Sequence, residues 1–346
     1  MRKERRAMGE QGRALGRGTD VRAGRTRLTR RLARPLLVAA VAIVGSCALF
    51  AAPALAAAPK VTTGAAGSIT YESAQLAASV NPGSESTEVY FQYGATAKYG
   101  SQSAPTQIAA GATTVPVSIA ISGLTAGTVY HYRIVATNAT STALGVDRSF
   151  TTAKIPLSLA ITAAPNPVIF GNAVTVEGTL SGTGNAGVAV QLQQSQFPYT
   201  TGFASVGNAE LTLSDGTFVF NELGLALNTE YRVVSGATIS GTVVVADAVS
   251  VALTARATGT KRRPTVRFSG TIAPGEPSAR IAFERLVGTS WKVVGGTVAV
   301  AAVNNGTVGF ASTVRIHHSG FFRALVLPVE GAHVSGYSQT VVIKLK

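Results

Sequence analysis

The 346-residue chain has one cysteine, Cys47, and therefore lacks the pair needed for a disulfide within one chain. A cysteine-based metal site is excluded for the same reason, and no disulfide-linked partner is expected. Charged residues make up only 13% of the chain, whereas hydrophobic residues make up 46%. Disorder would need more charge or less hydrophobicity. Together with 37 glycines, this composition favours an extracellular all-β protein.

Signals for catalysis are also scarce. No Gly-x-Ser-x-Gly motif is present, and no two acidic residues lie close in sequence in a way that suggests an acid/base pair. The spacing of glycines in residues 182–187 matches the dinucleotide-binding fingerprint. However, Val188 then begins another strand, where the fingerprint requires a helix. His317 and His318 would point to opposite faces of a strand and could not share one metal ion. We therefore expect no enzyme, no cofactor and no metal site.

The N-terminal 56 residues resemble a secretory signal peptide. Residues 1–35 hold 12 Lys/Arg and 3 Asp/Glu, and residues 36–56 are uncharged. The basic region, the apolar run and the small-residue site Ala54–Ala56 predict cleavage after Ala56. The mature protein is then expected to be secreted or held at the cell surface.

Three alternatives for this leader stay open. Thr29–Arg31 resembles a twin-arginine signal, although Ala33 and Arg34 stand where that motif has apolar residues. Val44–Cys47 resembles a lipobox, which would make Cys47 a lipidated N-terminus. The apolar run is also long enough to remain as an uncleaved N-terminal membrane anchor.

The rest of the chain begins with a unit of alternating apolar and polar residues. Its clearest strand follows a tight polar turn at residues 124–128. Tyr130 and the alternate residues after it face one side, whereas His131 and Arg133 face the other. A tyrosine just after such a turn resembles the tyrosine corner of a β-sandwich, whose hydroxyl bonds back to upstream backbone.

Three segments of the unit 60–153 resemble the bacterial fibronectin type III domain: Ser79–Gly83, Val89–Gly94 and Gly123–Ala136. The family usually has proline where Ala126 stands. The resemblance implies a Greek-key sandwich of about seven strands.

The remaining residues form two copies of another unit, 156–256 and 257–346. Val188–Gln193 matches Ala279–Glu284, and Tyr231–Arg232 matches Phe322–Arg323, both at an offset of 91. A constant offset at matching chemistry indicates an internal repeat. Both copies resemble bacterial immunoglobulin-like domains. The predicted fold is therefore all-β, with three tandem Greek-key β-sandwich domains after the signal segment.

One candidate ligand face lies on the first sandwich. Two strands lie side by side in a fibronectin-type sheet. One holds Tyr90 and Gln92, and the other holds His131 and Arg133. Their outward residues would make one aromatic and polar face, of a kind that can bind peptide or sugar.

The second candidate surface is basic. Residues 257–346 hold 11 Lys/Arg and 3 Asp/Glu, whereas residues 57–256 hold 7 and 10. Such a charge imbalance indicates an anionic polymer as partner, such as a cell-wall or capsule polymer. The excess basic charge outside the leader is small, so no nucleic acid is expected. The candidate contacts are Lys261, Arg262, Arg263, Arg267, Arg280 and Arg323.

These observations predict a secreted or cell-surface structural and adhesive protein without catalytic activity, which contacts extracellular polysaccharide or protein. The alternative is a carbohydrate- or wall-binding accessory module that serves a separate hydrolase. An exposed aromatic platform would favour the alternative. Trp291 is the only tryptophan, and its polar neighbours Ser290 and Lys292 predict that its ring faces inward.

Overall fold

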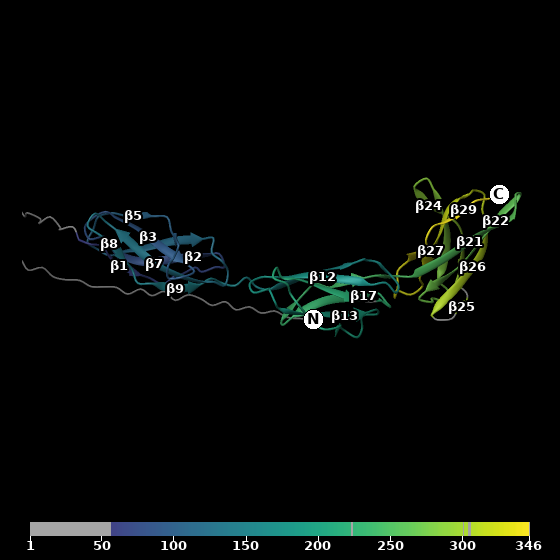
Figure 1. Cartoon of the computed structure of the whole chain (residues 1–346), viewed down its shortest axis with the longest axis horizontal. Helices are drawn as coiled ribbons and strands as arrows, with labels where there is room; N and C mark the ends of the chain where they lie inside the picture. Colours follow the sequence, from purple (N-terminus) through teal and green to yellow (C-terminus); the bar gives the residue numbers. More distant parts are fainter. Residues whose placement is uncertain (1–56, 223, 300, 304–305, 346) are drawn as a thin grey trace, which may run out of the picture. The chain divides into compact units, whose positions relative to one another are not determined.

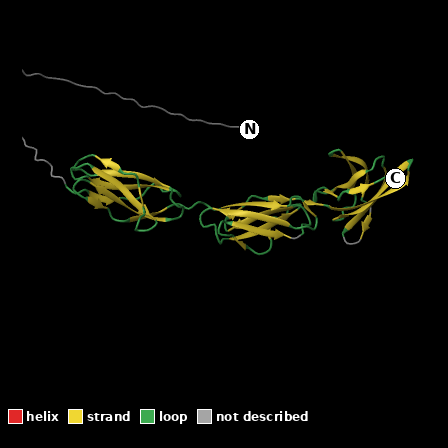
Figure 2. Cartoon of the chain, turned by 45° about the horizontal axis from the view of Figure 1, so that its top comes forward, coloured by secondary structure: helices red, strands yellow, loops and turns green. Residues whose placement is uncertain are grey.

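The computed structural model describes residues 57–346 except 223, 300, 304–305 and 346. Those residues form strands and loops (Figure 2). The predicted signal peptide, the twin-arginine motif, the lipobox at Cys47 and the membrane anchor all fall within residues 1–56, outside the described residues. No helix in the described part is long and apolar enough to cross a bilayer.

The first sandwich packs a three-stranded sheet against a six-stranded one. Its buried side chains come from alternate positions, as the pattern predicts: Leu76 and Val80 have no exposed surface on one strand, nor do Val89 and Phe91 on another. The first sheet has the order β1 (Lys60–Thr63), β2 (Ser73–Asn81), β6 (Val115–Ser122). The second is built on β3 (Thr87–Gly94) and β7 (Val129–Thr137), with β4 (Ser101–Gln102) and β5 (Thr106–Ile108) beside β3, and β8 (Thr142–Leu144) and β9 (Arg148–Thr151) beside β7.

The second sandwich has the same two-layer plan. One sheet has the order β10 (Ser158–Ala164), β12 (Val174–Ser181), β16 (Thr217–Glu222). The other pairs β13 (Ala189–Gln196) with β17 (Thr229–Ser235), flanked by β14 (Ala204–Ser205), β15 (Glu210–Leu211), β18 (Thr238–Ile239) and β19 (Val243–Val245). A short parallel pair, β11 (Val168–Ile169) and β20 (Asp247–Ala248), ties its first and last segments together. The glycine-rich segment 182–187 connects β12 to β13 and leads into no helix.

The third sandwich repeats this plan with longer strands (Figure 1). One sheet has the order β21 (Ser250–Thr260), β22 (Arg263–Ala273), β26 (Thr307–Arg315), β25 (Ala301–Val303). The other has the order β24 (Ser290–Val298), β23 (Arg280–Val287), β27 (Gly320–Leu327), β28 (Gly336–Tyr337), with β29 (Val341–Ile343) also on β27.

Three separate hydrophobic clusters, one per sandwich, form the described core. The strands β7, β17 and β27 are equivalent in the three sandwiches, and each contributes one buried aromatic ring. These rings belong to Tyr132, Tyr231 and Phe322, each at most 2% exposed. The fold is thus all-β and built from β-sandwiches, as predicted.

The predicted boundary between residues 256 and 257 falls inside β21. All of β21 pairs with β22 in one hairpin, and Val251, Leu253 and Ala255 pack against the core of the third sandwich. Gly259, just after the predicted boundary, lies at the end of this hairpin and adopts a φ of 88°. The third sandwich therefore begins near residue 249.

Candidate functional surfaces

The tyrosine corner fixes the start of β7, the strand that carries half of the first candidate face. The hydroxyl of Tyr130 accepts a hydrogen bond of 3.0 Å from the backbone N–H of Thr125. The Tyr130 ring is half-buried and stacks on Phe150, with ring centroids 5.8 Å apart. Tyr132 is buried two residues later, so His131 and Arg133 face outward, as the alternation predicts.

The structure brings Gln92 and Arg133 together on this face. They are directly opposite in the pairing of β3 with β7, and Arg133 Nε donates to Gln92 Oε1 at 2.9 Å. His131 is opposite Gly94, and Tyr90 is opposite Val135, so neither makes a direct cross-strand pair with the other candidates.

Two residues that the sequence did not single out complete the first face. Tyr99 lies under the guanidinium of Arg133, 4.8 Å from ring centroid to Cζ, and its hydroxyl donates to Asp147 Oδ1 at 2.9 Å. The other carboxylate oxygen of Asp147 lies 2.8 Å from His131 Nδ1. The hydrogen bonds from His131 and then Tyr99 hold the pKa of Asp147 below its usual value. The polar groups of this face thus bond to one another.

A shallow polar depression of about 370 Å³ lies beside this network. Arg133, Gln92 and Tyr99 line it together with the turn that contains Lys98 and Gly100. Its size is at the lower end for small-molecule sites, and such sites are mostly apolar, which this depression is not.

The arginine on this face has an equivalent in every sandwich. In each, it lies directly opposite an amide or carboxylate across the central strand pair, and its Nε donates to that group within 2.9 Å. Because the pair recurs in all three sandwiches, it serves first to hold the central strands together. The pairs are Arg133–Gln92, Arg232–Gln193 and Arg323–Glu284.

This finding removes Arg323 from the group of free cations. Its Nε lies 2.7 Å from Glu284 Oε2, and its guanidinium packs between the rings of Trp291 and Tyr337, at 4.3 and 4.1 Å. Trp291 therefore lies on the outer side of the sheet with Arg323, and the prediction that its ring faces inward is wrong. The polar neighbours of Trp291 gave no sign of this, because its partner is 32 residues away in the chain.

The six candidate contacts for a polyanion do not form one surface. Lys261 and Arg262 form the exposed turn between β21 and β22, and Arg263 and Arg267 point outward from β22. Arg280 is exposed, but it lies on β23, in the opposite sheet. The hairpin thus brings together four of the six, without Arg280 and Arg323.

Two further arginines extend the hairpin group. Arg256 is directly opposite Arg267 on β21, and Arg315 on β26 is opposite Thr265, the outward residue between Arg263 and Arg267. The side chains of Arg256, Arg263, Arg267 and Arg315 are all exposed and form no ion pair or hydrogen bond with other described residues. We call these four residues the basic face.

Hydroxyl groups surround the arginine pair of the basic face, and carboxylates do not. Thr254 and Ser269 form a cross-strand hydroxyl pair on one side of Arg256 and Arg267, with their oxygens 3.0 Å apart. Thr258 and Thr265 form an equivalent pair on the other side, also at 3.0 Å. The outward positions of β21, β22 and β26 contain no Asp or Glu. The face therefore presents unneutralised positive charge between hydrogen-bonding groups.

Sequence reasoning missed Arg256 because the boundary placed it in the second sandwich. It missed Arg315 because only the sheet order β21–β22–β26 places it beside Arg263 and Arg267. The exposed pair His317 and His318 follows Arg315 in a loop, and the described residues hold no cluster of His, Cys, Asp and Glu with the geometry of a metal site.

Comparison with known proteins assigns no family to the chain. No family model matches the chain, and no curated protein matches it. Among solved structures, the sensor domain of the anti-sigma factor RsgI4 from Pseudobacteroides cellulosolvens matches at 18% identity, over 28% of this chain and 90% of that one, with a TM-score of 0.23. A tandem repeat from the extending region of a large adhesion protein matches at 12% identity, over 83% and 74%, with a TM-score of 0.29. The first three fibronectin domains of chicken CNTN1 match at 11%, over 83% and 99%, with a TM-score of 0.27.

At these identities and scores, the likeness carries no argument. The all-β fold rests on the sheets and cores described above, which form two-layer β-sandwiches.

Proposed function

We propose that this chain is a non-catalytic extracellular scaffold whose third sandwich holds an anionic polymer on the basic face. The observation that supports this most is the cross-strand pair of Arg256 and Arg267. Like charges that are directly opposite in a sheet destabilise it. A surface that keeps such a pair, with no carboxylate beside it, suits a partner that supplies the negative charge.

The spacing of the basic face fits a linear polymer better than a compact ligand. Neighbouring strands are about 4.8 Å apart, and alternate residues on one strand are about 6.6–6.8 Å apart. The four arginines of the basic face thus place their charges along and across three strands. A wall polymer with a phosphate or carboxylate on each repeat unit would meet several of them at once.

The families of the three domains are also part of this proposal. We infer a bacterial fibronectin type III domain at the start of the described chain, followed by two bacterial immunoglobulin-like domains. Secretion through the signal peptide 1–56 would place the protein where such polymers occur.

The alternative of a sugar-binding accessory module has one observation in its favour, because Trp291 and Tyr337 lie on an outer sheet face. However, the guanidinium of Arg323 lies between the two rings and occupies one face of each. The basic face therefore supports polymer binding better than this aromatic pair supports sugar binding.

The direct test is binding of residues 57–346 to an immobilised polyol-phosphate polymer and to a neutral polymer of the same length, each at low and at physiological salt. We expect retention on the anionic polymer alone, and weaker retention at physiological salt, where the Debye length falls to about 8 Å. Equal retention on both polymers, or none on either, would contradict the proposal.

A further inference from the structure

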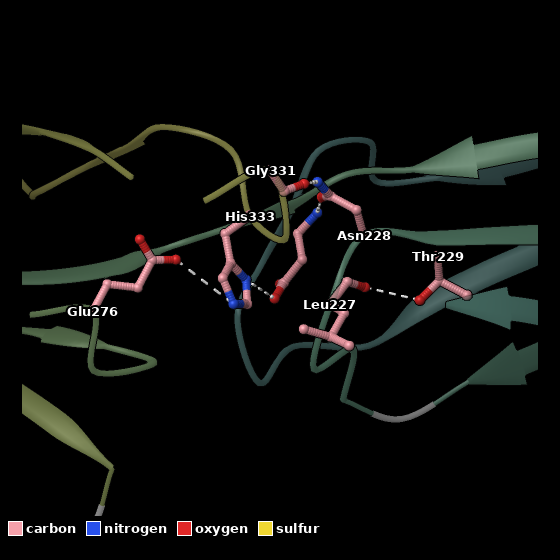
Figure 3. A network of polar contacts seen from close by, with 7 residues as sticks. Leu227, Asn228, Thr229, Glu276, Gly331 and His333 are labelled. Atoms are coloured by element: carbon pink, nitrogen blue, oxygen red, sulfur yellow. Dashed lines mark hydrogen bonds and ion pairs between the residues drawn. The ribbon is translucent and has the colours of Figure 1, made fainter. Parts of the chain in front are cut away.

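A buried charged cluster lies where the second sandwich meets the third (Figure 3). Asp247 belongs to β20, the last strand of the second sandwich, and has no exposed surface. His333 comes from the loop between β27 and β28, and Glu276 from the loop between β22 and β23. The side chains of His333 and Glu276 are only 7% and 13% exposed.

The imidazole lies between the two carboxylates. His333 Nδ1 is 3.0 Å from Asp247 Oδ2, and His333 Nε2 is 3.8 Å from Glu276 Oε1. The two carboxylates face opposite ring nitrogens and do not converge on one point. This arrangement can share protons with the imidazole, but it does not form a metal site. Phe170, from the second sandwich, packs edge-on against the same ring.

Backbone hydrogen bonds hold the loop of His333 against the second sandwich. Asn228 donates from its backbone N to Ala332 O and from Nδ2 to Gly331 O, both at 2.8 Å. Its Oδ1 accepts from the backbone N of Asp247 at 2.7 Å. Val334 N donates to the carbonyl of Asp247 at 2.8 Å. Asp247 and His333 are therefore fixed by the contact between the sandwiches itself.

The cluster has fewer hydrogen-bond donors than its acceptors need. Asp247 Oδ1 and Glu276 Oε1 are buried and receive no hydrogen bond from the described residues. A neutral imidazole donates from one nitrogen, whereas the protonated ring donates from both. Even with a charged ring, two carboxylates leave one negative charge uncompensated in a buried place. One more proton would supply the missing donor and neutralise that charge.

We propose that the Asp247–His333–Glu276 cluster is a protonation-dependent lock, which holds the second and third sandwiches together in mildly acidic solution and releases them as the pH rises. The neighbouring side chains of Asn228 and Phe170 are uncharged, so the three residues of the cluster determine its charge. This lock is independent of the basic face and of polymer binding.

The sign of the pH effect follows from proton linkage. Burial raises the pKa of Asp247, and the hydrogen bond from His333 offsets this only in part. A group whose pKa is raised in the docked state favours docking below its ordinary pKa, and this contribution is lost as the pH rises through the raised value.

The lock can be tested by distance measurement, since residues 57–346 contain no cysteine. Spin labels on Asn208→Cys and Thr289→Cys, both exposed, report the distance between the second and third sandwiches. Electron–electron double resonance is then recorded at about pH 5 and about pH 8. We expect a narrow distance distribution at the lower pH and a clearly broader one at the higher pH.

His333→Gln keeps a hydrogen-bonding side chain that cannot become charged, and Glu330→Gln removes an exposed carboxylate from the same loop as a matched control. We expect His333→Gln to reduce or abolish the pH dependence and Glu330→Gln to keep it. Equal widths at both pH values in the parent would overturn the proposal, whether narrow or broad. Full pH dependence in His333→Gln would overturn it as well.

Discussion

Two glycines at equivalent places in the second and third sandwiches offer a sharp test of core packing. Gly178 on β12 is directly opposite Phe218, and Gly270 on β22 is directly opposite Phe310. Each phenylalanine is buried and turns its ring over the glycine. A Cβ on Gly178 would meet the ring of Phe218 and lie 2.6 Å from Ala160 O.

A Cβ on Gly270 would likewise lie 2.7 Å from Phe310 Cζ. Alanine at either position must therefore displace a ring or a neighbouring strand. Overpacking of this kind costs about 1–3 kcal/mol. Gly241→Ala is the matched control, because a Cβ there would have nothing within 4 Å. At such an open position, the loss of glycine's freedom in the unfolded chain stabilises the protein by about 0.4–1 kcal/mol.

Urea denaturation of residues 57–346 can separate the two sandwiches. Trp291 is the only tryptophan, so its fluorescence reports unfolding of the third sandwich, while circular dichroism reports all three. We expect Gly270→Ala to lower the fluorescence midpoint and Gly178→Ala to lower only the circular dichroism transition of the second sandwich. If either variant is as stable as Gly241→Ala, the packing described here is refuted.

Two further substitutions test single side chains. Tyr130→Phe removes the hydrogen bond from Thr125 N–H and should lower the stability of the first sandwich by about 1 kcal/mol, measured by thermal denaturation. An unchanged stability would show that this hydrogen bond does not hold the corner. Arg323→Met leaves Glu284 without its partner and should cost about 1.5–3 kcal/mol, together with a change in the emission of Trp291; unchanged emission would mean that the guanidinium does not lie on the indole ring.

The strands of the described chain were largely predictable, because alternation of apolar and polar residues is a local signal. The buried alternate positions of β2 and β3 and the corner at Tyr130 follow from their own segments of sequence. The boundary between the second and third sandwiches could not be predicted in this way, because the long hairpin of β21 and β22 contains small polar residues that resemble a linker.

Features that depend on distant residues were not predictable from local patterns. Arg256 and Arg315 join the basic face through sheet order, and Trp291 is turned outward by packing against Arg323. The cluster of Asp247, Glu276 and His333 combines residues up to 86 positions apart. Only the contact between sandwiches brings them together.

The central claim is that the basic face, and not the net charge of the third sandwich, holds an anionic polymer. Its most direct measurement compares the double variant Arg256→Glu/Arg267→Glu with Arg280→Glu/Lys292→Glu, which makes the same charge change at exposed positions of the opposite sheet. Affinity for a polyol-phosphate polymer is measured against salt concentration for both variants and for the parent.

We expect the first variant to lose most of its affinity and to show a slope of log affinity against log salt that is smaller by about 0.7–0.9 for each lost phosphate contact, as for nucleic acids. The second variant should stay close to the parent. Equal losses in the two variants would show that net charge alone attracts the polymer, and this would contradict the account.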